Sequence, residues 1–331
     1  MMGGWDVYCA ICASNFKKRI VADSDDQSPN TYRADTIGES DTTWLGKVHG
    51  LGSNPDASGD RKGFYLLNQE MVNPNVPTKS SEEPIDFVAY NDPDGKQQPV
   101  FPVHAICYRD ILPRCIKDAK QETMDDDTLY TLFEGIVASN RWNRLDLDYG
   151  GPKPPKDQYW VSRKGEEALV TNPVDIPQLQ GYLEKIQATV NQDKQSTESQ
   201  KPPSTVDIFD KLPSELRLEI LNLLPTASAL ALKAASWTML TTPLSWQQKL
   251  TSDMPWLWDF RDIEVDICKS QELNERLYRV MSELDDKSRY KKDKADYFPG
   301  LVNRRRIWGV CESIRSLYLE KLDSKKGGKS D

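Results

Sequence analysis

A short helix bounded by two prolines, Pro213 and Pro225, constrains the fold more than any other stretch of the chain. Proline suits the first turn of a helix, where an N–H is not needed, and it cannot continue a helix at the far end. Because successive side chains on a helix lie about 100° apart, the apolar residues between the prolines cover one broad arc. This arc is wider than the core of a small helical unit requires, so we predict that part of it contacts another protein. The arc consists of Leu216, Ile220, Leu221, Leu223 and Leu224.

Two further short helices are predicted after Pro225. Thr226 or Ser228 can cap the second helix, and Thr242 with Pro243 has the chemistry of an N-cap and a first turn for the third. The third helix has Leu244, Trp246 and Leu250 as apolar anchors. Three short helices bury little core by themselves, so this unit needs further packing partners.

The order of apolar residues from Asp207 to Leu250 resembles the F-box. The resemblance is carried by Leu212-Pro213, Ile220-Leu221, Leu223-Leu224, Leu230 and Ala235-Ser236. It departs from the family at Trp237, where a basic residue often follows the serine, which leaves the register of the third helix open. The alternative is an ordinary helical hairpin packed inside a larger core.

The resemblance implies a partner. F-box proteins bind the Skp adaptor of an SCF-type cullin–RING ubiquitin ligase and bring a substrate protein to it. The residues that would contact the adaptor are Leu212, Pro213, Leu216, Ile220, Leu221, Leu224 and Leu230.

The predicted fold class is α+β, with a mixed N-terminal domain, an all-α three-helix F-box and C-terminal helices. The segment before the F-box is polar, lacks aromatic residues and ends in prolines, as flexible linkers do. The expected order is a mixed domain at 1–186, a linker at 187–206, the F-box at 207–250, helices at 251–320 that pack on it, and a disordered charged tail at 321–331.

Two pairs of potential metal ligands lie far apart in the N-terminal half. Cys9 and Cys12 form a Cys-x-x-Cys pair, and His104 and Cys107 follow a predicted strand. Together they make the Cys₃His set of structural zinc, with Cys115 as a thiol that could substitute. We therefore predict one structural zinc ion. The alternatives are two unrelated pairs of buried thiols, or a His104–Cys107 catalytic dyad, for which no oxyanion hole is marked.

Four other segments give specific expectations. Residues 44–51 have helical spacing of apolar residues, and the aspartates at 125–127 should cap the helix that follows. The aromatic residues at 256–260 should be buried against the third F-box helix, unless they form an exposed substrate clamp. The arginines at 304–306 are predicted to lie on a solvated helix face, with a nuclear import signal as the alternative.

The N-terminal half has a resemblance of its own. Cys-Ala-Ile-Cys near the start, Trp44-Leu45, Phe101-Pro-Val-His104 with Cys107, and the segment 172–177 are similar to the region that precedes the F-box in a group of fungal F-box proteins. That resemblance implies no enzyme chemistry for this half of the chain.

Charge and hydropathy exclude several classes of function. The net charge of −8 and the pI of about 5.1 argue against nucleic acid as the main partner. The sequence has no apolar run long enough to span a membrane, and its start lacks the basic and apolar regions of a secretory signal. Six cysteines then read as reduced thiols or metal ligands, in a cytoplasmic or nuclear protein that is not secreted.

The predicted function is recruitment of a substrate protein without catalysis. Residues 1–186 are favoured as the recognition module, through loops at 23–41, 52–63 and 91–99. The rival function is a zinc-organised structural or scaffold protein with no role in a ligase. A hydrolase has no nucleophile–base pattern behind it in the sequence.

Overall fold

The computed structural model divides the chain into two compact units. Unit 1 comprises Met1–Asp175 and Tyr290–Asp331, and unit 2 comprises Ile176–Arg289. The structure describes residues 6–16, 22–23, 30–38, 40–53, 64–67, 89–90, 98–120, 124–137, 144–155, 159–193, 207–242, 244–261, 263, 271–291 and 296–327. The mixture of helices and strands bears out the α+β fold class.

Unit 1 contains a three-stranded antiparallel sheet with the order β4-β3-β5. Val48 in the central strand lies opposite His104, and Leu51 lies opposite Phe101. A methyl group on Gly52 would lie 2.8 Å from a methyl of Val100, so the close approach there requires glycine. The strands are β3 (Val48–Ser53), β4 (Phe64–Leu67) and β5 (Phe101–His104), and a separate parallel pair joins β1 (Ala22–Asp23) to β2 (Tyr32–Arg33).

The helix predicted over residues 44–51 is wrong. Residues Thr43–Gly46 form a 3-10 turn, η1, and the chain then continues as β3. Gly50 and Gly52 are poor helix formers, and an extended backbone lets β3 pair on both of its edges. The strand predicted before the His104–Cys107 pair is present as β5, and most of the loop predicted at 91–99 lies outside the described residues.

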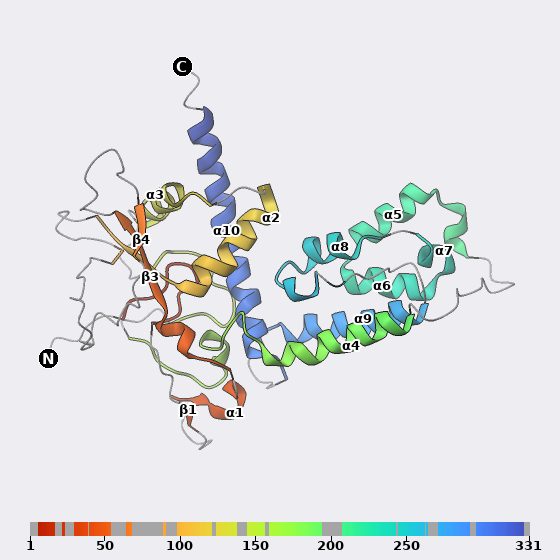
Figure 1. Cartoon of the computed structure of the whole chain (residues 1–331), viewed down its shortest axis with the longest axis horizontal. Coiled ribbons are helices and arrows are strands. Elements are labelled where there is room, and N and C mark those ends of the chain that lie inside the picture. Colours follow the sequence, from red (N-terminus) through yellow and green to blue (C-terminus); the bar gives the residue numbers. More distant parts are fainter. Residues whose placement is uncertain are drawn as a thin grey trace. The chain divides into compact units, whose positions relative to one another are not determined.

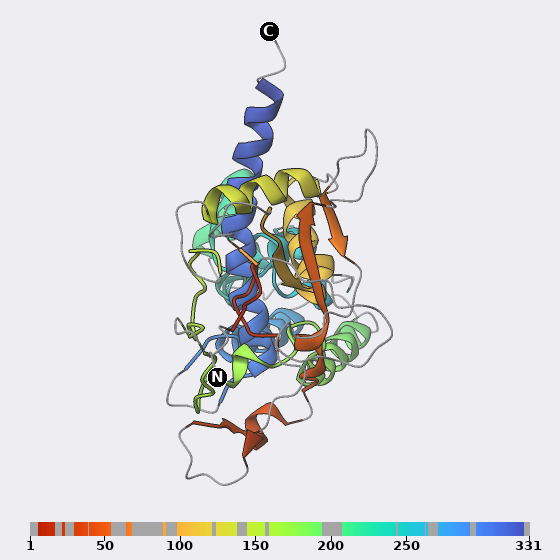
Figure 2. The same ribbon diagram turned by 90° about the vertical axis from the view of Figure 1, so that its left-hand side faces the viewer.

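The helices of unit 1 pack around this sheet. Thr128 donates its backbone N–H to Asp125 at 3.0 Å, so the aspartates do cap α3. The longest helix, α10, packs against α2, α3 and η3, and its C-terminal turns extend past them (Figures 1 and 2). The helical segments are α1 (Ala34–Ile37), η2 (Cys107–Ile111), α2 (Leu112–Lys120), α3 (Asp126–Val137), η3 (Glu167–Leu169) and α10 (Pro299–Gly327).

Unit 2 is helical throughout its described residues. The helix α9 packs against α6 and α4, as Figure 1 shows. Its segments are α4 (Pro177–Asp193), η4 (Ile208–Lys211), α5 (Ser214–Leu223), α6 (Thr226–Ala235), α7 (Trp237–Leu240), α8 (Trp246–Asp253), η5 (Trp258–Phe260) and α9 (Gln271–Lys287).

The proline boundaries of the short helices are confirmed, and two predicted caps are wrong. Neither Thr226 nor Ser228 caps α6, which begins at Thr226 and has no side-chain cap. Pro213 and Pro225 stand at the N-cap positions of α5 and α6. The third expected helix, α8, is capped by the Ser245 hydroxyl, which accepts from the backbone N–H of Gln248, and not by Thr242. An additional short helix, α7, lies before Thr242. Its cap is the Ser236 hydroxyl, which accepts from the backbone N–H of Met239.

Two polar side chains, the buried Lys233 and the half-buried Asp207, hold the short helices of unit 2 together. The ammonium of Lys233 donates to the backbone carbonyls of Met239, Leu240 and Thr242, at 3.0 Å and 2.8 Å for the first two. The carboxylate of Asp207 accepts from the Ser236 hydroxyl and from the backbone N–H of Thr238. Buried polar groups of the loop around α7 are thus satisfied within the unit.

The domain boundaries differ from those predicted. The helix α4 begins at Pro177, belongs to unit 2 and continues to Asp193 inside the expected linker. The rest of the linker, 194–206, lies outside the described residues. Of the helices expected after residue 250, α9 packs on α6, but α10 belongs to unit 1 and continues as helix through Gly327, where a disordered tail was predicted. The buried side chains of α10 pack against other elements of unit 1. Helical periodicity in the sequence shows that a face is buried, but it does not show which part of the chain covers that face.

The aromatic residues at 256–260 are buried, as predicted. Trp256, Trp258 and Phe260 are almost fully covered, and the indole N–H of Trp246 in α8 donates to the carbonyl of Phe260 at 3.3 Å. They are therefore core residues, and an exposed aromatic substrate clamp at this position is excluded. Within the described chain, no helix combines the length and the hydropathy needed to cross a membrane.

Candidate functional site

The first ligand pair lies in a tight hairpin at the start of unit 1. Tyr8 and Asn15 form an antiparallel bridge at its base, and the backbone N–H of Cys9 donates to the carbonyl of Ser14 at 2.9 Å. At the turn, the N–H of Ala13 donates to the Cys9 carbonyl at 2.8 Å, and Ala13 itself has a positive φ of 55°. This folded-back turn brings Cys9 and Cys12 close to each other.

The second ligand pair lies where β5 ends and η2 begins. His104 is the last residue of the strand, and Cys107 is the first residue of η2, so the predicted strand-to-helix junction is confirmed. The hairpin docks on this strand through the N–H of Ala10, which donates to the Pro102 carbonyl at 2.8 Å. The backbone N–H of His104 also points at the Cys9 sulfur, at 3.3 Å. The fold thus joins two pairs that are more than ninety residues apart.

The four predicted ligand residues form one cluster. The ligand atoms of Cys9, Cys12, His104 and Cys107 all lie within 4.8 Å of one another, and Cys12 Sγ is 3.2 Å from His104 Nδ1. Four ligands around a tetrahedral zinc ion have sulfur–sulfur separations of roughly 3.8 Å, so small side-chain shifts would suffice to bind one. Among the described residues, the alternative thiol Cys115 is not part of this group.

The histidine of the cluster is oriented for metal binding. Its Nε2 lies 3.0 Å from the backbone carbonyl of Asn15, a contact in which Nε2–H donates and Nδ1 is left for a metal. The rings of Trp44 and Phe16 lie 4.6 and 4.7 Å from the His104 ring, centroid to centroid. Trp44 is fixed in turn by its indole N–H, which donates to the Val170 carbonyl at 3.0 Å. An apolar shell of this kind excludes water from a metal centre.

Electrostatics within the cluster favour negative charge on the Cys12 sulfur. Burial by itself would raise the pKa of Cys12, but hydrogen bonds with Cys107 and Cys9 and the nearby charge of His104 lower it well below the usual thiol value. Burial would lower the pKa of His104, and the Cys12 and Cys9 sulfurs nevertheless raise it to about 10. Burial and the neighbouring thiols raise the pKa of Cys107. The site is therefore built to hold positive charge, which a metal cation would supply in place of protons.

The catalytic dyad considered from the sequence does not fit this geometry. The imidazole nitrogen Nδ1 of His104 contacts Cys12, and Cys107 was the expected nucleophile. Cys12, His104 and Cys107 have no exposed surface, so a substrate could not reach the thiolate. A buried cluster of four soft ligands has the properties of a structural metal site.

Two arginines of α10 are buried, and one of them, Arg306, lies beside this cluster, which corrects the prediction of a solvated or nuclear-import face at 304–306. Arg306 Nη1 donates to the Cys12 carbonyl at 2.8 Å, and Nη2 donates to Asn303 Oδ1 at 2.8 Å. Arg304 donates to the carbonyls of Pro173 and Val174 at 2.6 and 2.8 Å. Three consecutive arginines resemble a surface patch in the sequence. Nothing in the local sequence pattern indicated that two of them face inward.

In unit 2, the residues predicted to bind a partner differ in their accessibility. Leu216 is 52% exposed and Pro213 is exposed, whereas Leu221 and Leu230 are fully buried and belong to the core of the unit. Leu212, Ile220 and Leu224 are half-buried. The available part of the predicted surface is therefore Leu212, Pro213, Leu216, Ile220 and Leu224.

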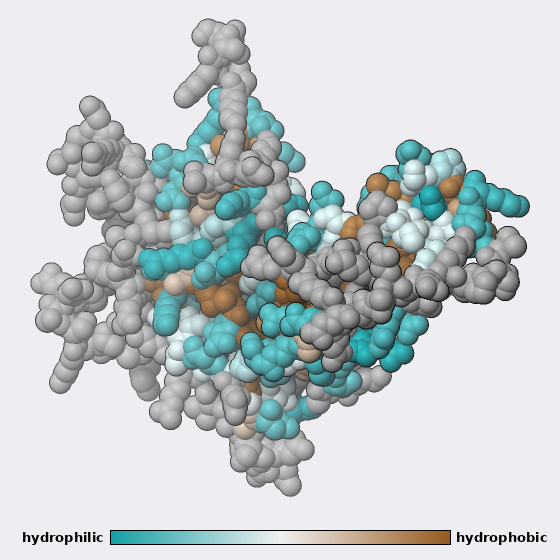
Figure 3. Space-filling view, turned by 45° about the vertical axis from the view of Figure 1, so that its right-hand side comes forward, coloured by the Kyte–Doolittle hydropathy of each residue, from teal (hydrophilic) through white to brown (hydrophobic). Residues whose placement is uncertain are grey.

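Three further apolar side chains extend this surface. Ile208 and Leu223 are each 76% exposed, and Leu218 is 36% exposed. Figure 3 shows apolar residues in brown among hydrophilic ones on the surface of unit 2, at the right of the view. Leu223 lies on the predicted arc, but Ile208 precedes the helix and Leu218 lies beyond the edge of the arc, so helical periodicity could not indicate them. We refer to Ile208, Leu216, Leu218 and Leu223 as the α5 surface.

Comparison with known proteins gives no relative for this chain. No family model matches it, and neither the curated proteins nor the solved structures contain a match. The resemblance to the F-box therefore stays a prediction from the residues themselves.

Proposed function

We propose that the chain is a substrate-recruiting F-box adaptor of an SCF-type cullin–RING ubiquitin ligase. Unit 2 would bind the Skp adaptor through the α5 surface together with Leu212 and Pro213. The chain would transfer no ubiquitin itself. Its contribution would be to hold a substrate protein near the ligase, which raises the effective concentration of the reacting groups.

The observation that carries this proposal is the exposure of the α5 surface, whose residues flank a Leu-Pro step on both sides. Folding normally buries leucine and isoleucine, and full burial of one such side chain contributes about 1.5 to 3 kcal/mol. Four such side chains on η4 and α5 are exposed. In the isolated chain they therefore do not gain much of the free energy that burial would contribute. Clustered exposed apolar residues mark surfaces for protein partners. Leu216 and Leu223 lie on the same side of α5, about 20° apart, and the buried Leu221 lies on the other side, in the core of the unit.

The test is co-purification of the full chain with the Skp adaptor. Leu216→Asp and Leu223→Asp should abolish binding in titration calorimetry, because a carboxylate would have to be buried in an apolar interface. Tyr278→Asp is the matched control, since Tyr278 is an exposed apolar residue of unit 2 on α9, 38% exposed. The proposal is wrong if the unmodified chain does not bind the adaptor, or if all three variants bind it equally.

The rival function, a zinc-organised structural or scaffold protein with no ligase role, is favoured by one specific observation. Cys9, Cys12, His104 and Cys107 lie together in the core of unit 1. We propose that they hold one structural zinc ion, which would join the N-terminal hairpin to the end of β5. A zinc site fits either function, so only the absence of adaptor binding would favour the scaffold.

Metal content tests the zinc proposal independently of any partner. Elemental analysis should give about one zinc per chain, and cobalt substitution should give the absorption of a tetrahedral thiolate site. Cys107→Ala should lose the metal, and Cys115→Ala, a buried thiol outside the cluster, should retain it. Full-length protein that is folded and free of metal would contradict the proposal.

A further inference from the structure

Residues 144–155 of unit 1 form an ordered loop that is closed on itself. Arg144 Nη1 donates to the carbonyl of Pro155 at 2.7 Å, which ties the two ends of the loop together. Inside it, the Tyr149 hydroxyl donates to the Leu145 carbonyl at 2.8 Å, and Gly150 has a positive φ of 63°. Compact surface loops whose ends meet and whose own side chains pack inside them are frequently binding sites.

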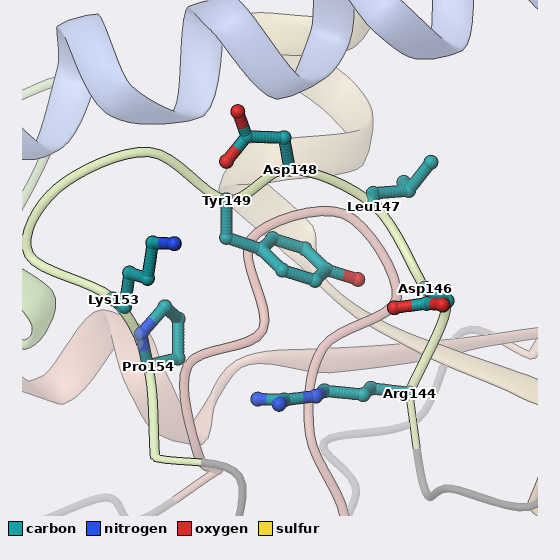
Figure 4. Close-up of a pocket in the computed structure, with 7 residues that line it drawn as sticks. All are labelled: Arg144, Asp146, Leu147, Asp148, Tyr149, Lys153 and Pro154. Carbon is teal, nitrogen blue, oxygen red and sulfur yellow. The ribbon is translucent and has the colours of Figure 1, made fainter.

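The loop encloses a hollow of about 310 Å³. Figure 4 shows the ring of Tyr149 on one side of this hollow and the side chain of Arg144 on the other. Lys153 and Pro154 close one end, and the carboxylate of Asp146 lies at the other end, on the side of the tyrosine hydroxyl. The volume is at the lower limit of ligand pockets, which suits one amino-acid side chain with its adjoining backbone.

The positions of the charges give the hollow a positive and a negative end. The guanidinium carbon of Arg144 lies 5.9 Å from the ring centres of both Tyr8 and Tyr149, so the two rings hold this cation in place. Figure 4 shows the ammonium of Lys153 at the same end as the Arg144 guanidinium, whereas the Asp148 carboxylate points away from the ring. An anionic group would thus meet Arg144 and Lys153, and an N–H donor would meet Asp146.

We propose that this hollow binds a peptide segment through one anionic side chain, a carboxylate or a phosphate, with Lys153 and Arg144 as the charge partners and Asp146 as the acceptor for a backbone N–H. A peptide supplies an anion and an N–H within one residue, which matches the two ends of the hollow. A nucleic-acid backbone would meet two carboxylates of this loop and a chain of net charge −8. This proposal rests on the proposed function, because the peptide segment would belong to the recruited protein. The residues that line the hollow are different from those of the α5 surface.

The probe is a set of capped heptapeptides of glycine, serine and alanine in which only the central residue varies. Glutamate, phosphoserine, glutamine and lysine at that position separate charge from shape and carboxylate from phosphate. Binding to the full chain should be at least about tenfold tighter for glutamate or phosphoserine than for glutamine, the size expected of a charge-assisted hydrogen bond. The stronger of the two anionic peptides identifies the source of the anion.

Charge reversal tests the assignment of the residue. In Lys153→Glu, the affinity for the anionic peptides should fall by about tenfold or more, and the variant should bind the lysine peptide instead. Lys47→Glu is the matched control, because Lys47 is an exposed lysine of unit 1 that does not line the hollow. Equal binding of the glutamate and glutamine peptides, or unchanged binding by Lys153→Glu, would overturn the proposal.

Measuring Skp-adaptor binding with the same preparations separates the two proposals. Adaptor binding without selective peptide binding means that the hollow is not the recognition site. Selective peptide binding without adaptor binding means that the ligase role is wrong and the peptide site stands. Lys153→Glu should leave adaptor binding unchanged, because Lys153 belongs to unit 1 and the α5 surface belongs to unit 2.

Discussion

Replacement of Arg306 by methionine should destabilise unit 1 far more than its position on a helix near the end of the chain suggests. Methionine fills a similar volume and keeps the helical propensity, so the change removes mainly the hydrogen bonds. Arg306 is 5% exposed, and its guanidinium serves the Cys12 carbonyl in the ligand turn and the side-chain oxygen of Asn303. The substitution therefore acts on the cluster from a distant part of the sequence.

The expected magnitude follows from the acceptors that lose their donors. The Cys12 carbonyl and Asn303 Oδ1 would each be left buried without this partner, at a cost of about 1 to 3 kcal/mol each. A total of about 3 kcal/mol corresponds to a roughly hundredfold increase in the population of the opened hairpin. Folded domains have only about 5 to 15 kcal/mol of stability, so this is a substantial fraction.

Hydrogen exchange measured by mass spectrometry on residues 6–16 is the suitable assay. The N–H groups of Cys9 and Ala13 are held by hydrogen bonds inside the hairpin, so they report its opening directly. Their protection should fall by about two orders of magnitude in Arg306→Met. Arg315→Met, on the same helix and half-buried, is the control. Equal protection in the two variants would refute the idea that Arg306 stabilises the ligand turn.

Three other outcomes are expected in unit 2. Lys233→Met should cost about 3 kcal/mol or more in chemical denaturation, because three buried carbonyls lose one shared donor. Leu221→Ala should cost about 2 to 5 kcal/mol, whereas Leu223→Ala, on the exposed face, should cost less than about 0.5 kcal/mol. For Asp207, desolvation opposes ionisation, but hydrogen bonds from Ser236, Phe209 and Thr238 outweigh it and lower the pKa of the carboxyl. The contribution of Asp207 to the free energy of unfolding is therefore present above its unfolded-state pKa, and it is lost as pH falls through its folded-state pKa. On acidification, the urea midpoint should drop less in Asp207→Asn than in the unmodified chain.

Local chemistry predicted the boundaries of the short helices well. Pro213 and Pro225 act on their own neighbours, and the Asp125 carboxylate accepts from the backbone N–H of Thr128 within one turn. Such signals depend on a few adjacent residues, so they can be read without the fold. The helix predicted over residues 44–51 was wrong because contacts distant in the sequence decided the conformation there. The apolar spacing of these residues suited a helix, but pairing of β3 on both edges decided the conformation.

The metal cluster could be predicted because ligand chemistry restricts the choice. Few residue types bind zinc, and the chain has only two histidines and six cysteines, so Cys9, Cys12, His104 and Cys107 formed an obvious set. What the sequence could not indicate was the surroundings of the cluster. Arg306 is nearly three hundred residues from Cys12, and nothing in the local pattern distinguishes it from the exposed face of a charged helix.

Unit 1 is interrupted in the sequence, and this affects the order in which the chain can fold during its synthesis. The ribosome releases all of unit 2 before Tyr290, so the helices that carry the α5 surface can assemble while the C-terminal part of unit 1 is still missing. The Cys12 carbonyl receives its arginine only after α10 has emerged. A chain shortened by premature termination within α10 would therefore keep the α5 surface but lack a finished unit 1. The hairpin that holds Cys9 and Cys12 therefore gains its arginine contact only after α10 has been synthesised.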